Sequence, residues 1–121
     1  MNQEIKWRSK PDSQDYPAAL SYLKLIYTED AAKKFVARLK KTSVTNFTAK
    51  DVFRASSLSL PGVSNFHVEK DRKKIREGEK LSPILLVRDT ANGRVVIADG
   101  YHRLCAVYSF DEDGVIPCRI V

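Results

Sequence analysis

The chain has 121 residues, of which 43% are hydrophobic and 30% charged, and its formal net charge is +6. This size predicts one globular domain with its own core. No apolar run reaches the roughly 18 residues that a membrane-spanning helix needs, and residues 1–15 lack the apolar segment of a secretory signal. We therefore expect a cytoplasmic protein with no membrane partner, whose positive charge suits a nucleotide, a nucleic acid or another acidic molecule.

The first 15 residues are polar and show little periodicity, so we expect an arm that docks on the core through Trp7. Asp15, followed by Pro17, is typical of a helix start. The apolar stripe expected on this helix comprises Leu20, Leu23, Leu25, Ile26 and Tyr27.

A second helix is predicted after Thr28, a good N-cap residue that two acids follow. The spacing of its apolar residues predicts a buried face made of Ala31, Ala32, Phe35, Val36 and Leu39. Four lysines fall outside that face: Lys33, Lys34, Lys40 and Lys41. They form either a solvated surface near the negative end of the helix or a surface that contacts the phosphates of a nucleic acid.

Residues 42–46 are expected to be a connection, and Thr48 to cap a short third helix. Residues 56–64 read SSLSLPGVS and predict a loop, because they carry a Pro-Gly turn signal. The charged residues 69–78 predict a fourth helix that ends at a glycine. His67 precedes it among apolar neighbours and becomes interesting for function only if folding brings it near the other histidine, His102.

Residues 83–87 form a continuous apolar run typical of a buried strand. Asn92-Gly93 is a strong hairpin signal, and residues 95–98 are the partner strand. A last helix and a closing strand over residues 116–121 complete the predicted sheet. Cys105 and Cys118 lie in apolar segments and are expected to be free, buried thiols.

The residues best suited to binding a ligand lie where the strand at 95–98 meets the last helix: Asp99, Gly100, Tyr101, His102 and Arg103. The first N–H groups of a helix have no internal partner and can bind an anion. Gly100 lacks a Cβ, so we expect a ligand to approach the backbone there. Arg103 can grip phosphate oxygens, and His102 can donate to them or exchange protons near neutral pH. The alternative is an ordinary Asp-Gly turn in which Asp99 is only an N-cap.

The segment ADGYHRLCA, with ILLVR before it and IPCRIV after it, resembles the core of the ParB/sulfiredoxin-like superfamily. The resemblance runs from about residue 56 to residue 121 and is specific only at the loop. Members of this superfamily include the sulfinic-acid reductase sulfiredoxin, the CTP-using segregation protein ParB and an ADP-dependent free-serine kinase, and each binds nucleotide phosphates at this loop. The resemblance implies binding of ATP, ADP or CTP with Mg²⁺ at residues 99–103.

The resemblance also implies that the charged helix sends polar side chains to the nucleotide, which makes Lys70, Lys73 and Lys74 additional candidates beside His67. Sulfiredoxin has a cysteine directly before its His-Arg pair, where this chain has Tyr101, so sulfinic-acid reduction is not expected. The serine kinase loop is the most similar of the three, through Asp99, Gly100, His102 and Arg103.

We therefore expect a mixed α+β fold in one domain, with an arm at 1–15, a helical part at 16–55 and a ParB/sulfiredoxin-like core at 56–121. The core is expected to be a small mixed sheet with flanking helices. Two functions stay open: a nucleotide-binding protein with kinase-like or phosphohydrolase-like activity, and a non-catalytic nucleic-acid-binding module, with nuclease activity as a further variant. Catalytic residues are not assigned. We assign no metal-ion site, although Asp99 can hold the Mg²⁺ that accompanies phosphates.

Overall fold

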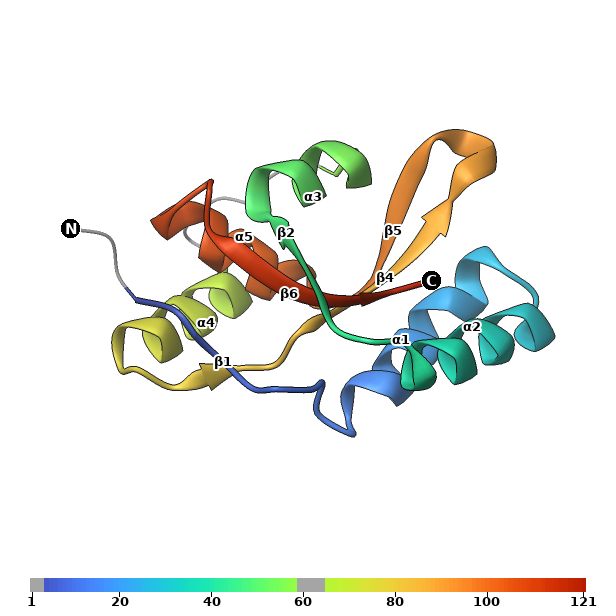
Figure 1. Ribbon diagram of the computed structural model, residues 1–121, viewed down its shortest axis with the longest axis horizontal. Coiled ribbons are helices and arrows are strands. Elements are labelled where there is room, and N and C mark those ends of the chain that lie inside the picture. The colour runs from blue at the N-terminus through green and yellow to red at the C-terminus, as the bar shows by residue number, and fades with distance from the viewer. Residues whose placement is uncertain (1–3, 59–64) are drawn as a thin grey trace.

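The computed structural model describes residues 4–58 and 65–121 and shows a mixed α+β fold (Figure 1). Its elements are β1 (Lys6–Trp7), α1 (Asp15–Ile26), α2 (Glu29–Lys41), β2 (Thr45–Thr48), α3 (Ala49–Ser56), α4 (Phe66–Arg76), β3 (Lys80–Leu81), β4 (Ile84–Asp89), a 3-10 turn (Thr90–Asn92), β5 (Arg94–Asp99), α5 (Tyr101–Phe110) and β6 (Val115–Ile120). The predicted class, N-terminal helices followed by a mixed sheet with flanking helices, is confirmed.

The main sheet has four strands in the order β2-β6-β4-β5. β4 is parallel to β6 and antiparallel to β5, while β2 is antiparallel to β6 at the other edge. α1 and α2 pack on one face of this sheet, and α3 and α5 pack on the other, with α4 beside α5 (Figure 1). β4 is therefore buried on both faces, which explains its unbroken apolar run.

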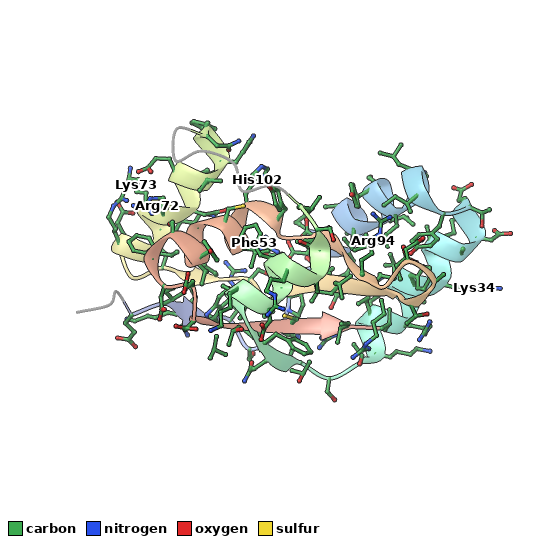
Figure 2. The ribbon with its side chains drawn as sticks, turned by 90° about the horizontal axis from the view of Figure 1, so that it is seen from above. Lys34, Phe53, Arg72, Lys73, Arg94 and His102 are labelled. Atoms are coloured by element: carbon green, nitrogen blue, oxygen red, sulfur yellow. The ribbon has the colours of Figure 1, made fainter. Side chains whose placement is uncertain are left out.

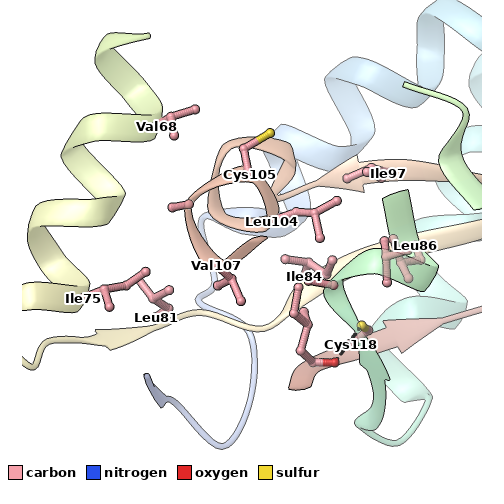
Figure 3. Close-up of a cluster of buried hydrophobic side chains, with 14 residues drawn as sticks. Val68, Ile75, Leu81, Ile84, Leu86, Ile97, Leu104, Cys105, Val107 and Cys118 are labelled. Atoms are coloured by element: carbon pink, nitrogen blue, oxygen red, sulfur yellow. Dashed lines mark hydrogen bonds between the residues drawn. The ribbon is translucent and has the colours of Figure 1, made fainter. Parts of the chain in front are cut away.

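Side chains of β4 divide the core into two clusters. Ile84 and Leu86 point into the cluster that α3, α4 and α5 cover, and Figure 3 shows Val68 and Ile75 of α4 reaching it from the side. Leu85 and Val87 point the other way, into the cluster beneath α1 and α2. Because successive strand residues alternate between faces, one strand serves both layers.

Both thiols are free and buried, as expected. Burial raises the pKa of Cys105 to about 11 and that of Cys118 to about 12. Each thiol therefore stays protonated near neutral pH and behaves as a small apolar side chain. The Cys118 thiol donates to the carbonyl of Ile116 (Figure 3).

The predicted stripe of α1 is partly wrong. Ala19 and Leu23 are fully buried against the sheet, whereas Leu25 is 83% exposed and Ile26 40% exposed. Residues 19 and 23 are four apart and share a face, but Leu25 lies two positions beyond Leu23 and points away from the sheet. In α2 the predicted cap is confirmed, since the Thr28 hydroxyl accepts from the Ala31 N–H at 3.2 Å. The core of the predicted α2 face, Ala32, Val36 and Leu39, is buried.

Three segments differ from the sequence prediction. The arm contains a two-residue strand, β1, which pairs with β3 and lets Trp7 pack on the core as expected. The connection at 42–46 was expected to be irregular, but β2 begins at Thr45 and pairs with β6 far along the chain. Such short, half-exposed pairings leave no periodic pattern in a sequence.

The third difference is the start of α4, which lies at Phe66 rather than at residue 69. The Asn65 side chain caps it by accepting from the N–H groups of His67 and Val68, at 2.9 and 3.2 Å. The helix ends before Gly78 (φ +75°), as predicted. Most of the predicted loop, residues 59–64 with its Pro-Gly signal, lies outside the described residues.

The hairpin between β4 and β5 agrees with its Asn-Gly signal. Gly93 adopts φ +62° and its N–H donates to the Thr90 carbonyl at 3.3 Å. The hairpin sets the register that brings the end of β5, and hence Asp99, beside Leu85 of β4. In the described part of the chain, no helix is both long and apolar enough to cross a bilayer.

Candidate functional site at the amino end of helix α5

The corner between β5 and α5 turns at Gly100, which adopts φ +107° and ψ 15°. A Cβ at this position would lie 2.8 Å from the Ile84 Cβ and 2.9 Å from the Arg103 Nη2. The expectation that a ligand approaches this side of Gly100 is therefore wrong, because Ile84 and Arg103 already fill the space. Glycine is needed here for its positive φ and for close packing within the protein.

Arg103 is held by carboxylates of the chain itself. Its Nη2 lies 3.1 Å from an Asp99 oxygen and 3.7 Å from an Asp15 oxygen, and the side chain is only 17% exposed. The Ser82 hydroxyl donates to Asp15, which also accepts from the Asp12 N–H at 3.3 Å. One guanidinium thus ties the start of α1 to the end of β5 and the first turn of α5.

The two carboxylates around Arg103 interact with each other. The pKa of Asp99 is raised to about 6, mainly by burial; Arg103 opposes the shift and nearby Asp15 adds to it. Asp99 therefore exchanges its proton near neutral pH. The Arg103 Nε is buried and has no hydrogen-bond partner among the described residues.

A polar pocket of ≈ 180 Å³ opens at this corner, between α4 and the amino end of α5. It is lined by His67, Lys70, Asp71, Lys74, Asp99, Gly100, Tyr101, His102 and Arg103. All five residues predicted at the loop line it. Gly100 is the N-cap residue of α5 and offers no side-chain acceptor, so the first N–H groups of the helix are directed toward this end.

Folding also brings His67 and His102 together. This proximity is the condition that we set for a functional role of His67. Their rings stack with centroids 4.8 Å apart at an angle of 29°. Burial lowers the pKa of His102, the neighbouring His67 lowers it further, and Asp71 opposes the shift. His102 is therefore mainly neutral near pH 7, and a bound anion would favour its protonation.

Of the lysine candidates on α4, Lys70 and Lys74 line the pocket and Lys73 does not. Lys73 points away from α5 (Figure 2) and lies 3.9 Å from Glu77. Asp71 also lines the pocket, because residues 67, 70, 71 and 74 share one helix face. The sequence alone did not fix which face of the helix turns toward α5, and the predicted helix started too late to include His67.

Tyr101 lines the pocket, but its aromatic ring packs against another part of the protein. The ring meets Phe53 edge-on, with centroids 6.5 Å apart. Burial and contact with Cys105 raise the pKa of Tyr101 to about 12, so the phenol stays neutral. With a protonated Cys105 one turn along the helix, the corner offers no thiolate for sulfinic-acid chemistry.

Two further groups of the corner were missed. Asp15 was predicted only as a helix-start residue, and Ser82 was not considered. Nothing local in the sequence links Asp15 to Arg103, because the contact joins residues 88 positions apart.

A larger hollow of ≈ 620 Å³ adjoins the polar pocket and shares residues 99–102 with it. Its other walls come from Ala18 and Tyr22 of α1, Leu58 beyond α3, and Ile97 and Ala98 of β5. Tyr22 and Leu58 are 41% and 43% exposed, which is high for large apolar side chains. The corner therefore has a polar side and a mainly apolar side.

A metal centre built by the protein alone is not present in residues 4–58 and 65–121, since no group of three or more His, Cys, Asp or Glu side chains converges there. Comparisons of the chain with protein-family models, curated proteins and solved structures find no match. The resemblance to the ParB/sulfiredoxin-like superfamily therefore stays a prediction.

Proposed function

We propose that this protein binds a nucleotide, with the phosphates in the polar pocket at the amino end of α5. One observation carries the proposal: His67, Lys70 and Lys74 of α4 converge with His102 at the amino end of α5, where the first N–H groups have no acceptor within the helix. Ammonium and imidazole groups around a helix amino end suit a polyanion, since both the charges and the helix dipole favour it.

The adjoining hollow supports a nucleotide over inorganic phosphate. A base needs an apolar surface beside the phosphate site, and the hollow supplies Tyr22, Leu58 and Ile97 there. Small-molecule pockets commonly enclose about 300–1,000 Å³ and combine apolar walls with a few polar groups. The ≈ 620 Å³ of this hollow falls in that range.

Arg103 has a different role in this proposal from the one expected at the outset. Its guanidinium is shared between Asp99 and Asp15, so it fixes the corner and offsets their charge. Direct phosphate contacts then fall to Lys70, Lys74, His102 and the backbone of the first turn. Lysine commonly binds phosphate in this way, as a point charge.

The proposal also includes turnover of the nucleotide, by a kinase-like or phosphohydrolase-like reaction. Such chemistry needs a carboxylate that holds Mg²⁺ or accepts a proton from the attacking hydroxyl. Mg²⁺ is commonly bound through one or two carboxylates together with substrate phosphates. Asp71 lines the pocket and burial raises its pKa, whereas Asp99 is engaged by Arg103, so Asp71 fits this role better.

The test is calorimetric titration with ADP, ATP and CTP, with and without Mg²⁺. We expect Lys70→Gln/Lys74→Gln to weaken the affinity for the preferred nucleotide by roughly tenfold or more, because two charged contacts are lost. Lys73→Gln is the matched control, since Lys73 lies on the same helix but outside the pocket. Equal losses in both variants, or no binding by the unmodified protein, would refute the proposal.

Turnover is tested separately by phosphorus NMR of the preferred nucleotide with Mg²⁺. Release of phosphate or transfer to a hydroxyl, lost in Asp71→Asn with binding retained, supports the catalytic part. Binding without any change in the phosphorus spectrum restricts the function to nucleotide binding.

A further inference from the structure

A second cationic surface lies on α2, apart from the α5 corner. After its first turn the helix carries no carboxylate and five cations: Lys33, Lys34, Arg38, Lys40 and Lys41. Burial of Ala32, Val36 and Leu39 fixes the orientation of the helix. Lys34, Arg38 and Lys41, spaced four and three residues apart, therefore form one outward row. Figure 2 shows Lys34 extending from the outer end of the molecule, away from His102.

The protein leaves this row unneutralised. Lys24 and Lys33 each lie 3.7 Å from Glu29, and Arg94 lies 3.0 Å from Asp89. Across residues 4–58 and 65–121, by contrast, Lys34, Arg38 and Lys41 form no ion pair. Unpaired like charges in one row repel one another. The last turn of the helix favours cations, and the Arg38 Cζ lies 6.0 Å from the centroid of the Phe35 ring, but neither contact neutralises the charge of the row.

Arg88 of β4 extends the row onto the sheet. Arg38, Lys41 and Arg88 line one hollow of ≈ 400 Å³, together with Thr42, Ile120 and Val121. No acidic side chain lines this hollow within the described part of the chain. Cations from a helix and from a strand far along the sequence thus face the same space. A favourable interaction of α2 cations with the helix dipole does not explain Arg88, which lies outside the helix.

An apolar hollow of ≈ 210 Å³ continues from the basic one, and the two share Arg88 and Ile120. Its walls are mainly Phe47, Val52, Leu86 and Val95. The one acid at its edge, Asp51, lies 3.9 Å from Arg54. The surface therefore combines a row of cations with an adjacent apolar site large enough for one flat ring.

We propose that α2 and the adjoining end of the sheet, where Arg88 and Ile120 lie, bind single-stranded nucleic acid. Lys34, Arg38, Lys41 and Arg88 contact successive phosphates, and one base enters the apolar hollow. Proteins that bind single strands combine a basic track with apolar or aromatic surfaces for bases. Steps of four and three residues along a helix advance by about 6 and 4.5 Å, a spacing that suits a repeating backbone better than one acidic group. In a duplex the bases are stacked and paired, so the apolar hollow would stay unused.

The experiment measures fluorescence anisotropy of a labelled twenty-nucleotide oligothymidylate over a salt series. Four phosphate contacts at about 0.7 each predict a log–log salt slope near −3, which is roughly a 50-fold loss of affinity between about 50 and 200 mM NaCl. In the row variant Lys34→Gln/Arg38→Gln/Lys41→Gln/Arg88→Gln we expect a slope near zero. The control Lys24→Gln/Lys33→Gln/Arg54→Gln/Lys73→Gln removes the same total charge elsewhere and should keep the slope.

Three outcomes would overturn the proposal. Equal losses in both variants would show that net charge alone attracts the strand. Equal affinity for the duplex would remove the role of the apolar hollow, and displacement of the strand by polyglutamate at equal charge would assign the surface to an acidic protein instead. Circular dichroism of both variants establishes that they are folded. Neither result depends on whether the α5 corner binds a nucleotide, because Lys70, Lys74 and His102 are unchanged in both variants.

Discussion

The α5 corner and the α2 row are both cationic in the sequence, but the fold treats their charges in opposite ways. Arg103 is largely buried, and two carboxylates share it. Lys34, Arg38 and Lys41 are exposed and form no ion pair within the described residues. A cation beside a glycine turn therefore need not be a ligand group. At the corner the free charges come from α4, and on α2 they come from the helix itself.

Removing Arg103 is expected to have the largest effect on stability. Arg103→Met leaves Asp15 and Asp99 facing each other in a buried site, and breaking such a cluster costs about 3–5 kcal/mol. Arg38→Met removes an exposed charge and should change the free energy of unfolding by less than about 0.5 kcal/mol. Urea denaturation of both variants measures the difference. Similar small effects would mean that the Asp15–Arg103–Asp99 cluster contributes little to the fold.

Two glycine substitutions, one at the α5 corner and one in the β4–β5 hairpin, separate the effect of packing from that of the positive φ. Gly100→Ala combines a disfavoured φ with overlap against Ile84 and Arg103, so we expect a loss of about 2–4 kcal/mol. Gly93→Ala shares the positive φ but meets nothing within 4 Å, and it should cost only about 1–2 kcal/mol. Thermal unfolding of both variants compares them. Equal losses would show that φ alone, without packing on Arg103, accounts for Gly100.

The excess of carboxylates at the corner predicts a pH effect. Because the folded pKa of Asp99 is about 6 and its ordinary value 3.8, the folded state holds the proton more tightly. The stability from this group is complete below about pH 4 and is lost as pH rises through about 6. Asp99→Asn keeps a neutral group at every pH and should be more stable than the unmodified protein at neutral pH by about 2–3 kcal/mol.

This effect is measured as the difference in unfolding free energy between the unmodified protein and Asp99→Asn over the acidic range. The difference should vanish below about pH 4 and grow toward neutral pH. A difference of the opposite sign would show that ionised Asp99 is stabilised by Arg103 more than burial penalises it.

The smallest predicted effect concerns the stacked histidines. Burial and the neighbouring His67 both lower the pKa of His102, so His67→Gln should raise that pKa. Proton NMR of the imidazole over a pH series measures the change, with His67→Gln compared against Lys73→Gln on the same helix. An unchanged pKa would mean that burial alone lowers it.

Much of the fold follows from local sequence patterns. The cap at Thr28, the Asn-Gly hairpin and the continuous run of β4 each depend on neighbouring residues, and the structure confirms them. β1 and β2 were missed because each consists of a few half-exposed residues paired with a distant strand. The start of α4 was missed because the Asn65 cap precedes the charged run.

The candidate site was predictable to the same extent. The loop residues 99–103 all lie at one pocket, because they are adjacent in the chain. Lys74 was one of three lysine candidates and Asp71 one of three possible acids, and neither could be singled out without the register of α4. The role of Arg103 could not be foreseen at all, since Asp15 reaches it only after α1 packs against β5.

Nucleotide binding at the α5 corner is tested most directly by a proton–nitrogen NMR titration with ADP and Mg²⁺. We predict that the amides of residues 100–104 and the side chains of Lys70, Lys74 and His102 shift together, with one dissociation constant, while the amides of α2 stay unchanged. Shifts confined to α2, or no shift at the corner when the thermal stability of the protein shows it to be folded, would contradict the proposal.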